Sequence, residues 1–207
     1  MKKCIGLFIV LMLLGSFSAC TPKDTIPPMF IQKATLTKDE EKIIKLLDLD
    51  TIADIYDFKV DDKLQSIHIN TYELKDGKWE MLMSDSSQMV KDVSGRLALS
   101  FNKLPSEFQV SIQSEHHNGT NRYSTDTTED YNNMTRAVSS LNSPTEIVYG
   151  KEIPLVMQIL TSQNVVSSYT LEHFYKPEVY EKHNYEHVYA ITIMFSEKSL
   201  GELDSPQ

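Results

Sequence analysis

The sequence predicts a mainly β protein: a β-rich α+β domain whose mostly antiparallel strands form a sandwich or a curved sheet. Three observations indicate this class. Short runs of alternating apolar and polar residues recur along the chain, turn residues separate them, and only two stretches show helical spacing instead. The 207 residues suffice for one sizeable core, so we expect a single domain over residues 37–196.

The first twenty residues, MKKCIGLFIVLMLLGSFSAC, have the pattern of an export signal. Two lysines precede an apolar run that is shorter than the roughly 20 residues of a membrane-spanning helix. The run leads into Phe17-Ser18-Ala19-Cys20, which resembles the lipobox of bacterial lipoprotein precursors, with Phe17 where leucine is usual. The resemblance implies that residues 1–19 are a signal peptide, that Cys20 receives a diacylglyceryl group, and that the mature chain begins at Cys20.

Location and partners follow from this anchor. Two acyl chains on Cys20 hold a protein stably at a bilayer, so we expect the extracytoplasmic face of a bacterial cell membrane. An ordinary secreted protein cleaved near Ala19, or an uncleaved anchor, are the alternatives. The net charge of −9 argues against a nucleic-acid partner. Since the only other cysteine is Cys4, the folded domain has no disulfide and no thiolate chemistry.

Residues 20–36 have the composition of a lipidated tether, because three prolines interrupt any helix, although Met29–Ile31 is a candidate edge strand. Thr37-Lys38-Asp39-Glu40 then matches a capping box, and apolar residues follow at helical spacing. This pattern predicts a short helix near 38–48. The aspartates that follow fail as a calcium loop, because the required glycine and glutamate are absent, and indicate an acidic surface.

From residue 55 the spacing changes from helical to alternating. Lys75-Asp76-Gly77-Lys78 is the clearest turn, because a type I′ hairpin needs positive φ at both central residues. Trp79, the only tryptophan, alternates with Met81 and Met83 in the return strand, and we expect it to be a buried core anchor. The strands predicted here are 55–60, 64–74 and 79–83.

Two further alternating runs, 97–101 and 108–112, are joined by Leu104-Pro105-Ser106. Asn118-Gly119 predicts the next turn, with a short strand beyond it. Apolar residues at helical spacing then predict a second short helix near 129–141. They are Tyr131, Met134, Val138 and Leu141.

The last third again has strand periodicity. Pro154 cannot donate to a ladder and belongs at the start of a strand or at a sheet edge. Lys176-Pro177-Glu178 predicts one helical turn. The final strand, 187–195, is apolar on both faces, which is typical of a central strand covered on both sides. Residues 197–207 predict a flexible acidic tail. The remaining strands predicted are 146–149, 153–160 and 165–175.

The sequence contains none of the common nucleophile-elbow, phosphate-loop, dinucleotide or zinc-protease motifs. The histidines are the one set with candidate chemistry. Three imidazoles near Glu172 and Glu186 can hold zinc if they converge. They are His173, His183 and His187. Their spacing is not diagnostic, so solvated or hydrogen-bonded histidines are the simpler interpretation, as they are for His116 and His117, and we expect no cofactor.

Aromatic residues gather in the same stretch and are candidates for a glycan or peptide groove, since tyrosine offers both a ring and a polar end. They are Phe174, Tyr175, Tyr180, Tyr185 and Tyr189. A partly exposed sheet face is the simpler interpretation. The whole sequence thus predicts a lipid-anchored bacterial envelope protein, most simply a non-enzymatic domain that binds a protein, peptide or glycan. The alternatives are an envelope enzyme whose site is assembled from distant residues and a histidine-based metal-handling protein.

Overall fold

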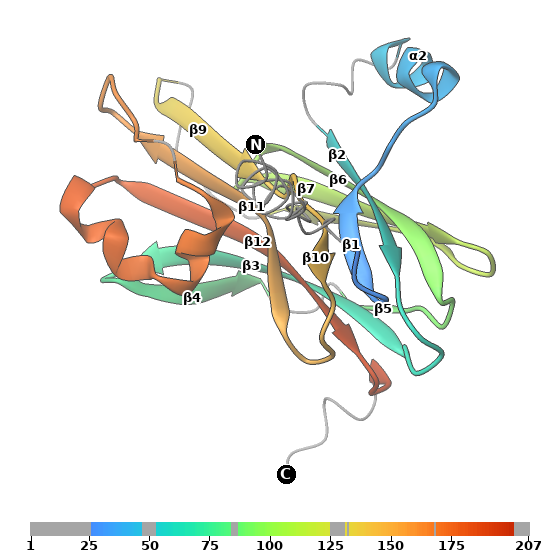
Figure 1. Cartoon of the computed structure of the whole chain (residues 1–207). Coiled ribbons are helices and arrows are strands. Elements are labelled where there is room, and N and C mark those ends of the chain that lie inside the picture. Colours follow the sequence, from blue (N-terminus) through green and yellow to red (C-terminus); the bar gives the residue numbers. More distant parts are fainter. Residues whose placement is uncertain are drawn as a thin grey trace, which may run out of the picture.

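The computed structural model describes residues 26–46, 53–83, 87–124, 131, 133–167 and 169–200. The predicted signal peptide and Cys20 lie outside these ranges. Among the described residues, no helix is long and apolar enough to cross a bilayer. The strands belong to two antiparallel sheets that pack face to face (Figure 1), so the predicted β-rich class and the sandwich are confirmed.

The first sheet contains β1 (Phe30–Lys33), β2 (Ala53–Lys59), β6 (Ser94–Lys103), β7 (Glu107–Ser114), β8 (Asn118–Ser124) and β10 (Thr145–Glu146). The second contains β3 (Ser66–Lys75), β4 (Lys78–Met83), β5 (Gln88–Met89), β9 (Thr135–Ser140), β11 (Glu152–Thr161) and β12 (His187–Ser196). The helical elements are α2 (Lys38–Leu46) and the 3₁₀ helices η1 (Leu171–Tyr175), η2 (Pro177–Val179) and η3 (Glu181–His183). Strand order is β10-β1-β2-β6-β7-β8 in the first sheet and β4-β3-β12-β11-β9 in the second, with β5 beside β3.

The main core fills the space between the two sheets. Alternate residues of each strand point inward, and aliphatic side chains such as Leu97, Val110 and Ile193 are fully buried there. The Phe58 ring on β2 meets Phe195 on β12 with centroids 5.5 Å apart. Burying such surface contributes roughly 25 cal/mol per Å², which is the main term available to a domain without disulfides.

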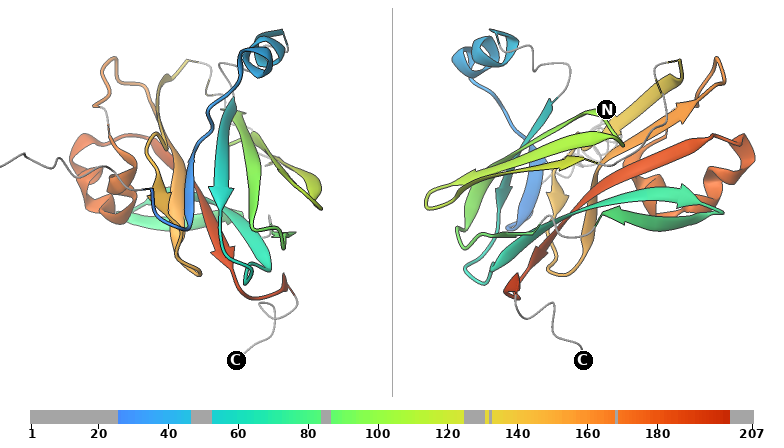
Figure 2. Two further views of the ribbon diagram at one scale, coloured as in Figure 1. Left: turned by 45° about the vertical axis from the view of Figure 1, so that its right-hand side comes forward. Right: turned by 180° about the vertical axis from the view of Figure 1, so that it is seen from behind.

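A second cluster lies on the outer face of the second sheet. Here η1–η3 cover the strands, as Figure 2 shows from two further sides. Val188 and Ala190 of β12 face this cluster, whereas Tyr189 and Ile191 face the main core. β12 is also the middle strand of its sheet. The prediction of a central strand covered on both sides is therefore confirmed.

The Asp76-Gly77 hairpin is also confirmed. Asp76 has φ 48° and Gly77 has φ 71°, as a type I′ turn requires, and Lys75 pairs with Lys78. Gly150 has φ 75° and lies in the turn before β11. Pro154 lies near the start of β11, as predicted, at an irregularity in the ladder with β12 and beyond the last residue of β11 that pairs with β9.

The first predicted helix is present as α2. Its capping box is formed, since Thr37 N–H donates to Glu40 Oε2 (2.7 Å) and Glu40 N–H donates to Thr37 Oγ1 (3.3 Å). The helix buries none of its residues and stands away from the sandwich in Figure 1. The Arg96 guanidinium bridges Glu40 (2.6 Å) and Asp57 (2.8 Å) and fastens the start of the helix to the first sheet.

The second predicted helix, 129–141, is wrong. Residues 135–140 form β9, while 129, 130 and 132 lie outside the described residues. Six residues of β9 pair in register with β11, from Thr135 opposite Thr161 to Ser140 opposite Val156. Without this pairing the edge of β11 would leave its backbone groups without partners, and that requirement outweighs the helical spacing of four apolar residues.

The predicted strand 165–175 is also wrong over the residues described. Residues 171–175 form η1, and η2 then supplies the predicted helical turn at Pro177. The apolar side chains of this segment cover the second sheet instead of extending it. Phe174 is buried against Trp79, with ring centroids 5.2 Å apart, and its carbonyl accepts a hydrogen bond from Trp79 Nε1 (2.8 Å). Trp79 is only partly buried and belongs to this outer cluster, so its prediction as a buried anchor of the core is corrected.

The turn predicted at Asn118-Gly119 lies at residues 115–117, and β8 begins at Asn118. Gly119 serves a close approach instead of a turn. A Cβ there would lie 2.5 Å from Gln88 Oε1 and 2.8 Å from His117 Nε2.

The folded domain extends slightly beyond its predicted bounds. Within the predicted tether, residues 30–33 form β1 and Ile31 is fully buried. At the other end, Lys198 O accepts a hydrogen bond from Ser66 Oγ (2.8 Å), and Glu197 lies 3.6 Å from Lys63. The remainder of the predicted acidic tail, 201–207, lies outside the described residues.

Candidate binding groove

A groove opens where the chain passes from one sheet to the other. β9 follows β11 as far as Ser140, and the last contact is the hydrogen bond from Leu141 N–H to Leu155 O (2.9 Å). The chain then leaves the second sheet and reaches β10, which pairs with β1 in the first sheet. The ladder between β9 and β11 therefore ends beside Leu155, and residues 142–144 lie beyond it.

Residues 169–175 form the opposite wall. Ser139 Oγ donates to the carbonyl of Tyr169 and ties the two walls together at one end. The backbone N–H of Thr170 donates to His173 Nδ1 (3.1 Å), which stabilises the start of η1. Tyr175 Oη donates to Glu152 O (2.8 Å) and fixes the end of η1 to the start of β11.

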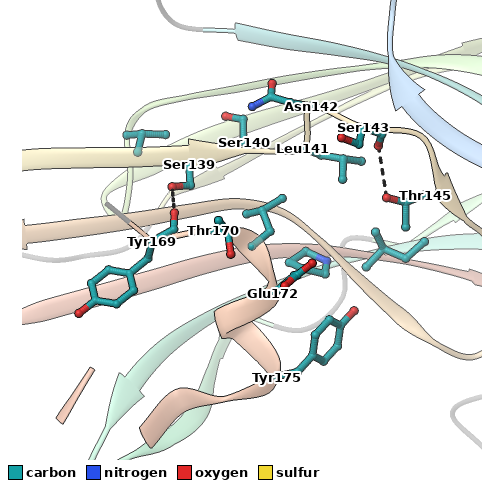
Figure 3. A pocket seen from close by; sticks show the side chains of 14 residues that line it. Ser139, Ser140, Leu141, Asn142, Ser143, Thr145, Tyr169, Thr170, Glu172 and Tyr175 are labelled. Atoms are coloured by element: carbon teal, nitrogen blue, oxygen red, sulfur yellow. Dashed lines mark hydrogen bonds between the residues drawn. The ribbon is translucent and has the colours of Figure 1, made fainter. Parts of the chain in front are cut away.

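The space between these walls is about 720 Å³. Figure 3 shows Ser139, Ser140 and Asn142 along one side and Thr170, Glu172 and Tyr175 along the other. Among the lining residues, Glu172 is the only one with a formal charge at neutral pH, and the others offer hydroxyl, amide or apolar groups. The other lining residues are Val138, Leu141, Ser143, Thr145, Ile153, Pro154, Tyr169 and Leu171.

The tyrosines of the groove remain neutral. Burial, followed by the nearby Glu152 carboxylate, raises the pKa of Tyr175, and burial raises the pKa of Tyr169. Tyr175 is nevertheless 53% exposed, because its hydroxyl is held while part of its ring faces solvent. The groove therefore presents an exposed aromatic surface beside several hydroxyl groups and one carboxylate, an arrangement suited to binding a polar ligand.

The histidines singled out from the sequence lie on both sides of the second sheet. The Tyr169 ring lies nearly perpendicular to the rings of His173 (centroids 5.1 Å apart) and His183 (5.6 Å apart) in the outer cluster. His187 stacks on Tyr189 of the main core, and its Nδ1 lies 3.2 Å from Glu73 Oε1. In the part of the chain that the structure describes, no three His, Cys, Asp or Glu side chains group as metal ligands would.

The remaining candidate residues have local hydrogen-bond partners. His116 Nδ1 lies 2.8 Å from Asp92, and His117 Nε2 lies 2.8 Å from Gln88. Glu186 accepts hydrogen bonds from Thr161 and Ser162, whereas Glu172 lines the groove.

The five aromatic residues do not form one surface. Phe174, Tyr180 and Tyr185 belong to the outer cluster, Tyr175 lines the groove, and Tyr189 faces the main core. Sequence reasoning thus found Tyr175 and Glu172, but missed the other wall, because Ser139 to Leu141 fell at the end of the wrongly predicted helix. The run Ser139-Ser140-Leu141-Asn142-Ser143-Pro144-Thr145, rich in serine and closed by proline, is a signal that could have indicated it.

Comparison with known proteins finds no matching family model, no matching curated protein and no matching solved structure.

Proposed function

We propose that this chain is a lipid-anchored protein of the bacterial envelope that binds a neutral glycan in the groove between β9 and η1. The observation that carries the proposal is the lining of that groove: hydroxyl and amide side chains beside the exposed ring of Tyr175, with Glu172 as the single charge. The lipobox at Phe17–Cys20 supplies the location. The protein holds its ligand without converting it.

The chemistry of the groove favours a glycan over other envelope polymers. Sugar hydroxyls both donate and accept hydrogen bonds, and the hydroxyls of Ser140 and Thr170 can do the same, whereas that of Ser139, which donates to the Tyr169 carbonyl, can only accept. The apolar C–H face of a sugar ring packs on an aromatic ring such as Tyr175. A phosphate-rich polymer is disfavoured, because no Lys or Arg lies among the lining residues and Glu172 would repel it, although Lys151 lies beside the groove with its Nζ 5.9 Å from the centre of the Tyr175 ring.

Binding is tested by titrating the mature domain with a linear oligomer of N-acetylglucosamine and measuring heat by calorimetry. We expect saturable binding that weakens at least tenfold in Tyr175→Ala, because the stacking surface is lost. Met81→Ala is the matched control, since it truncates another half-exposed side chain on β4, away from the groove. Binding that is absent, or that survives Tyr175→Ala unchanged, contradicts the proposed site.

The anchor is tested separately in cells. Cys20→Ala is expected to abolish incorporation of labelled palmitate and to leave the uncleaved precursor. Unchanged labelling in this variant contradicts the lipoprotein assignment without bearing on the groove.

A further inference from the structure

Three hydrogen-bonded side chains form a row where β3 meets β5. Ser66 Oγ lies 2.8 Å from His68 Nε2, and Ser87 Oγ lies 2.6 Å from His68 Nδ1. Ser66 and His68 are two residues apart on β3 and so share one face. Ser87 directly precedes β5, which pairs with β3 through Gln88 and Ile67. The ladder therefore positions all three side chains.

The tautomer of His68 sets the direction of the hydrogen bonds in this row. Ser66 Oγ donates its one hydrogen to Lys198 O (2.8 Å), so it must accept in its contact with His68. The Nε2 of His68 therefore carries a proton, and whenever the imidazole is neutral its lone pair is on Nδ1. In that neutral form Ser87 Oγ–H donates to Nδ1, and the three hydrogen bonds run from Ser87 to Lys198 O.

We infer that Ser87 is a nucleophile activated by His68, with Ser66 as the positioning residue, and that it accepts acyl groups from carboxylic esters. A hydroxyl within hydrogen-bond reach of a base, with a third group orienting that base, is the arrangement that activates serine in acyl transfer. Ser66 is fully buried, while His68 and Ser87 are only partly buried, so the row opens toward solvent at the nucleophile.

Ser87 Oγ bonds to the ester carbonyl carbon as its proton moves to His68 Nδ1. The bond between that carbon and the alcohol oxygen then breaks, and the alcohol leaves with the proton from His68. Water, deprotonated in turn by His68, bonds to the acyl carbon. The bond from that carbon to Ser87 Oγ then breaks, and His68 returns its proton to Ser87 Oγ as the carboxylic acid leaves.

This site is separate from the groove and does not depend on the proposed glycan binding. β12 and β11 lie between β3 and β9 in the second sheet, so neither Ser87 nor His68 lines the groove. The two sites can therefore fail independently.

The test uses an alkyl fluorophosphonate, which bonds covalently to activated serines with loss of fluoride. Intact-mass measurement of the mature domain is expected to show one adduct per chain, and peptide mapping is expected to place it on Ser87. Ser87→Ala should lose the adduct. His68→Gln should slow labelling by roughly 10²-fold, the lower range for removal of a general base. Ser111→Ala is the matched control, because the hydroxyl of Ser111 lies 2.9 Å from that of Thr120 instead of beside an imidazole. Labelling of this variant should be unchanged.

A positioning role for Ser66 is tested by rescue. Ser66→Ala should slow labelling, and Ser66→Thr, which keeps the hydroxyl, should restore it, while the melting temperatures of the variants show that each is folded. An adduct that persists in Ser87→Ala, equal labelling of His68→Gln and the parent domain, or no adduct on the folded domain each overturns the inference. Labelled protein should still bind the glucosamine oligomer, which separates this result from the test of the groove.

Discussion

The two faces of the second sheet are covered by different kinds of structure. The inner face meets the first sheet through side chains that are almost all fully buried, such as Ile191, Ile193 and Phe195. The outer face is covered by the segment 162–186, whose aromatic rings are in part exposed. Strand alternation alone produces the inner face, whereas the outer face depends on where an irregular segment folds back. We therefore expect the inner face to determine global stability and the outer face to be the weaker unit.

The largest effect is expected on the inner face. Phe195→Ala removes a fully buried ring that meets Phe58 across the two sheets, and it should lower the free energy of unfolding by about 3–5 kcal/mol. Urea denaturation followed by circular dichroism measures this change. Val148→Ala, a truncation of a half-exposed side chain, should stay within about 0.5 kcal/mol and serves as its control. Equal losses in the two variants would contradict the assignment of the core.

A smaller effect is expected on the outer face. Trp79→Ala removes the stacking on Phe174 and the hydrogen bond to its carbonyl, each worth about 0.5–1.5 kcal/mol, so the loss should be about 2 kcal/mol. Trp79→Phe keeps a ring and should recover roughly half of this loss. Because Trp79 is the only tryptophan, its emission reports on the outer cluster and should shift to the red on unfolding. A loss as large as that of Phe195→Ala would mean that the two faces do not differ.

The sequence predicted the parts of the fold that rest on local rules. Asp76-Gly77 adopts positive φ because of its own chemistry, and the two-sided apolar pattern of 187–195 already requires a central strand. The prediction from sequence failed where contact with a distant segment determines the secondary structure. Residues 135–140 become a strand because β11 has an open edge, and 171–175 become η1 because an apolar sheet face needs a cover. Neither partner can be read from the segment itself.

The candidate sites likewise contain some residues that the sequence indicated and others that depend on contacts between distant segments. Tyr175 was predicted as part of an aromatic groove and Glu172 only as a carboxylate near the candidate zinc histidines. The wall opposite them was not predicted, because it depends on where β9 leaves β11. The row of Ser66, His68 and Ser87 carries no motif at all. Two of its members follow the period of a strand, and the third is brought to them by β5.

The smallest effect concerns the hydrogen bonds that close the outer segment. Glu186 lies where the segment 162–186 returns to β12, and its carboxylate accepts hydrogen bonds from Thr161 Oγ1 (2.5 Å) and Ser162 N–H (3.1 Å) at the point where the segment begins. The hydroxyl of Ser162 also donates to it. These hydrogen bonds, those from Ser162 and Thr161 first, lower the pKa of Glu186 from 4.5 to about 2. A folded-state pKa below that of the unfolded chain stabilises the fold fully above about pH 4.5, and this stabilisation is lost as the pH falls toward 2.

Glu186→Gln should therefore reduce the fall in melting temperature across that window by a small amount, because the group is close to solvent. Glu178→Gln, the same change on an exposed glutamate of η2, controls for net charge. Since the outer face is the weaker unit, hydrogen exchange near pH 3 should rise first in residues 162–186 of the parent domain, before the inner strands respond. If exchange rises equally in β12 and in the segment, Glu186 supports the whole sandwich and the distinction between the two faces does not hold.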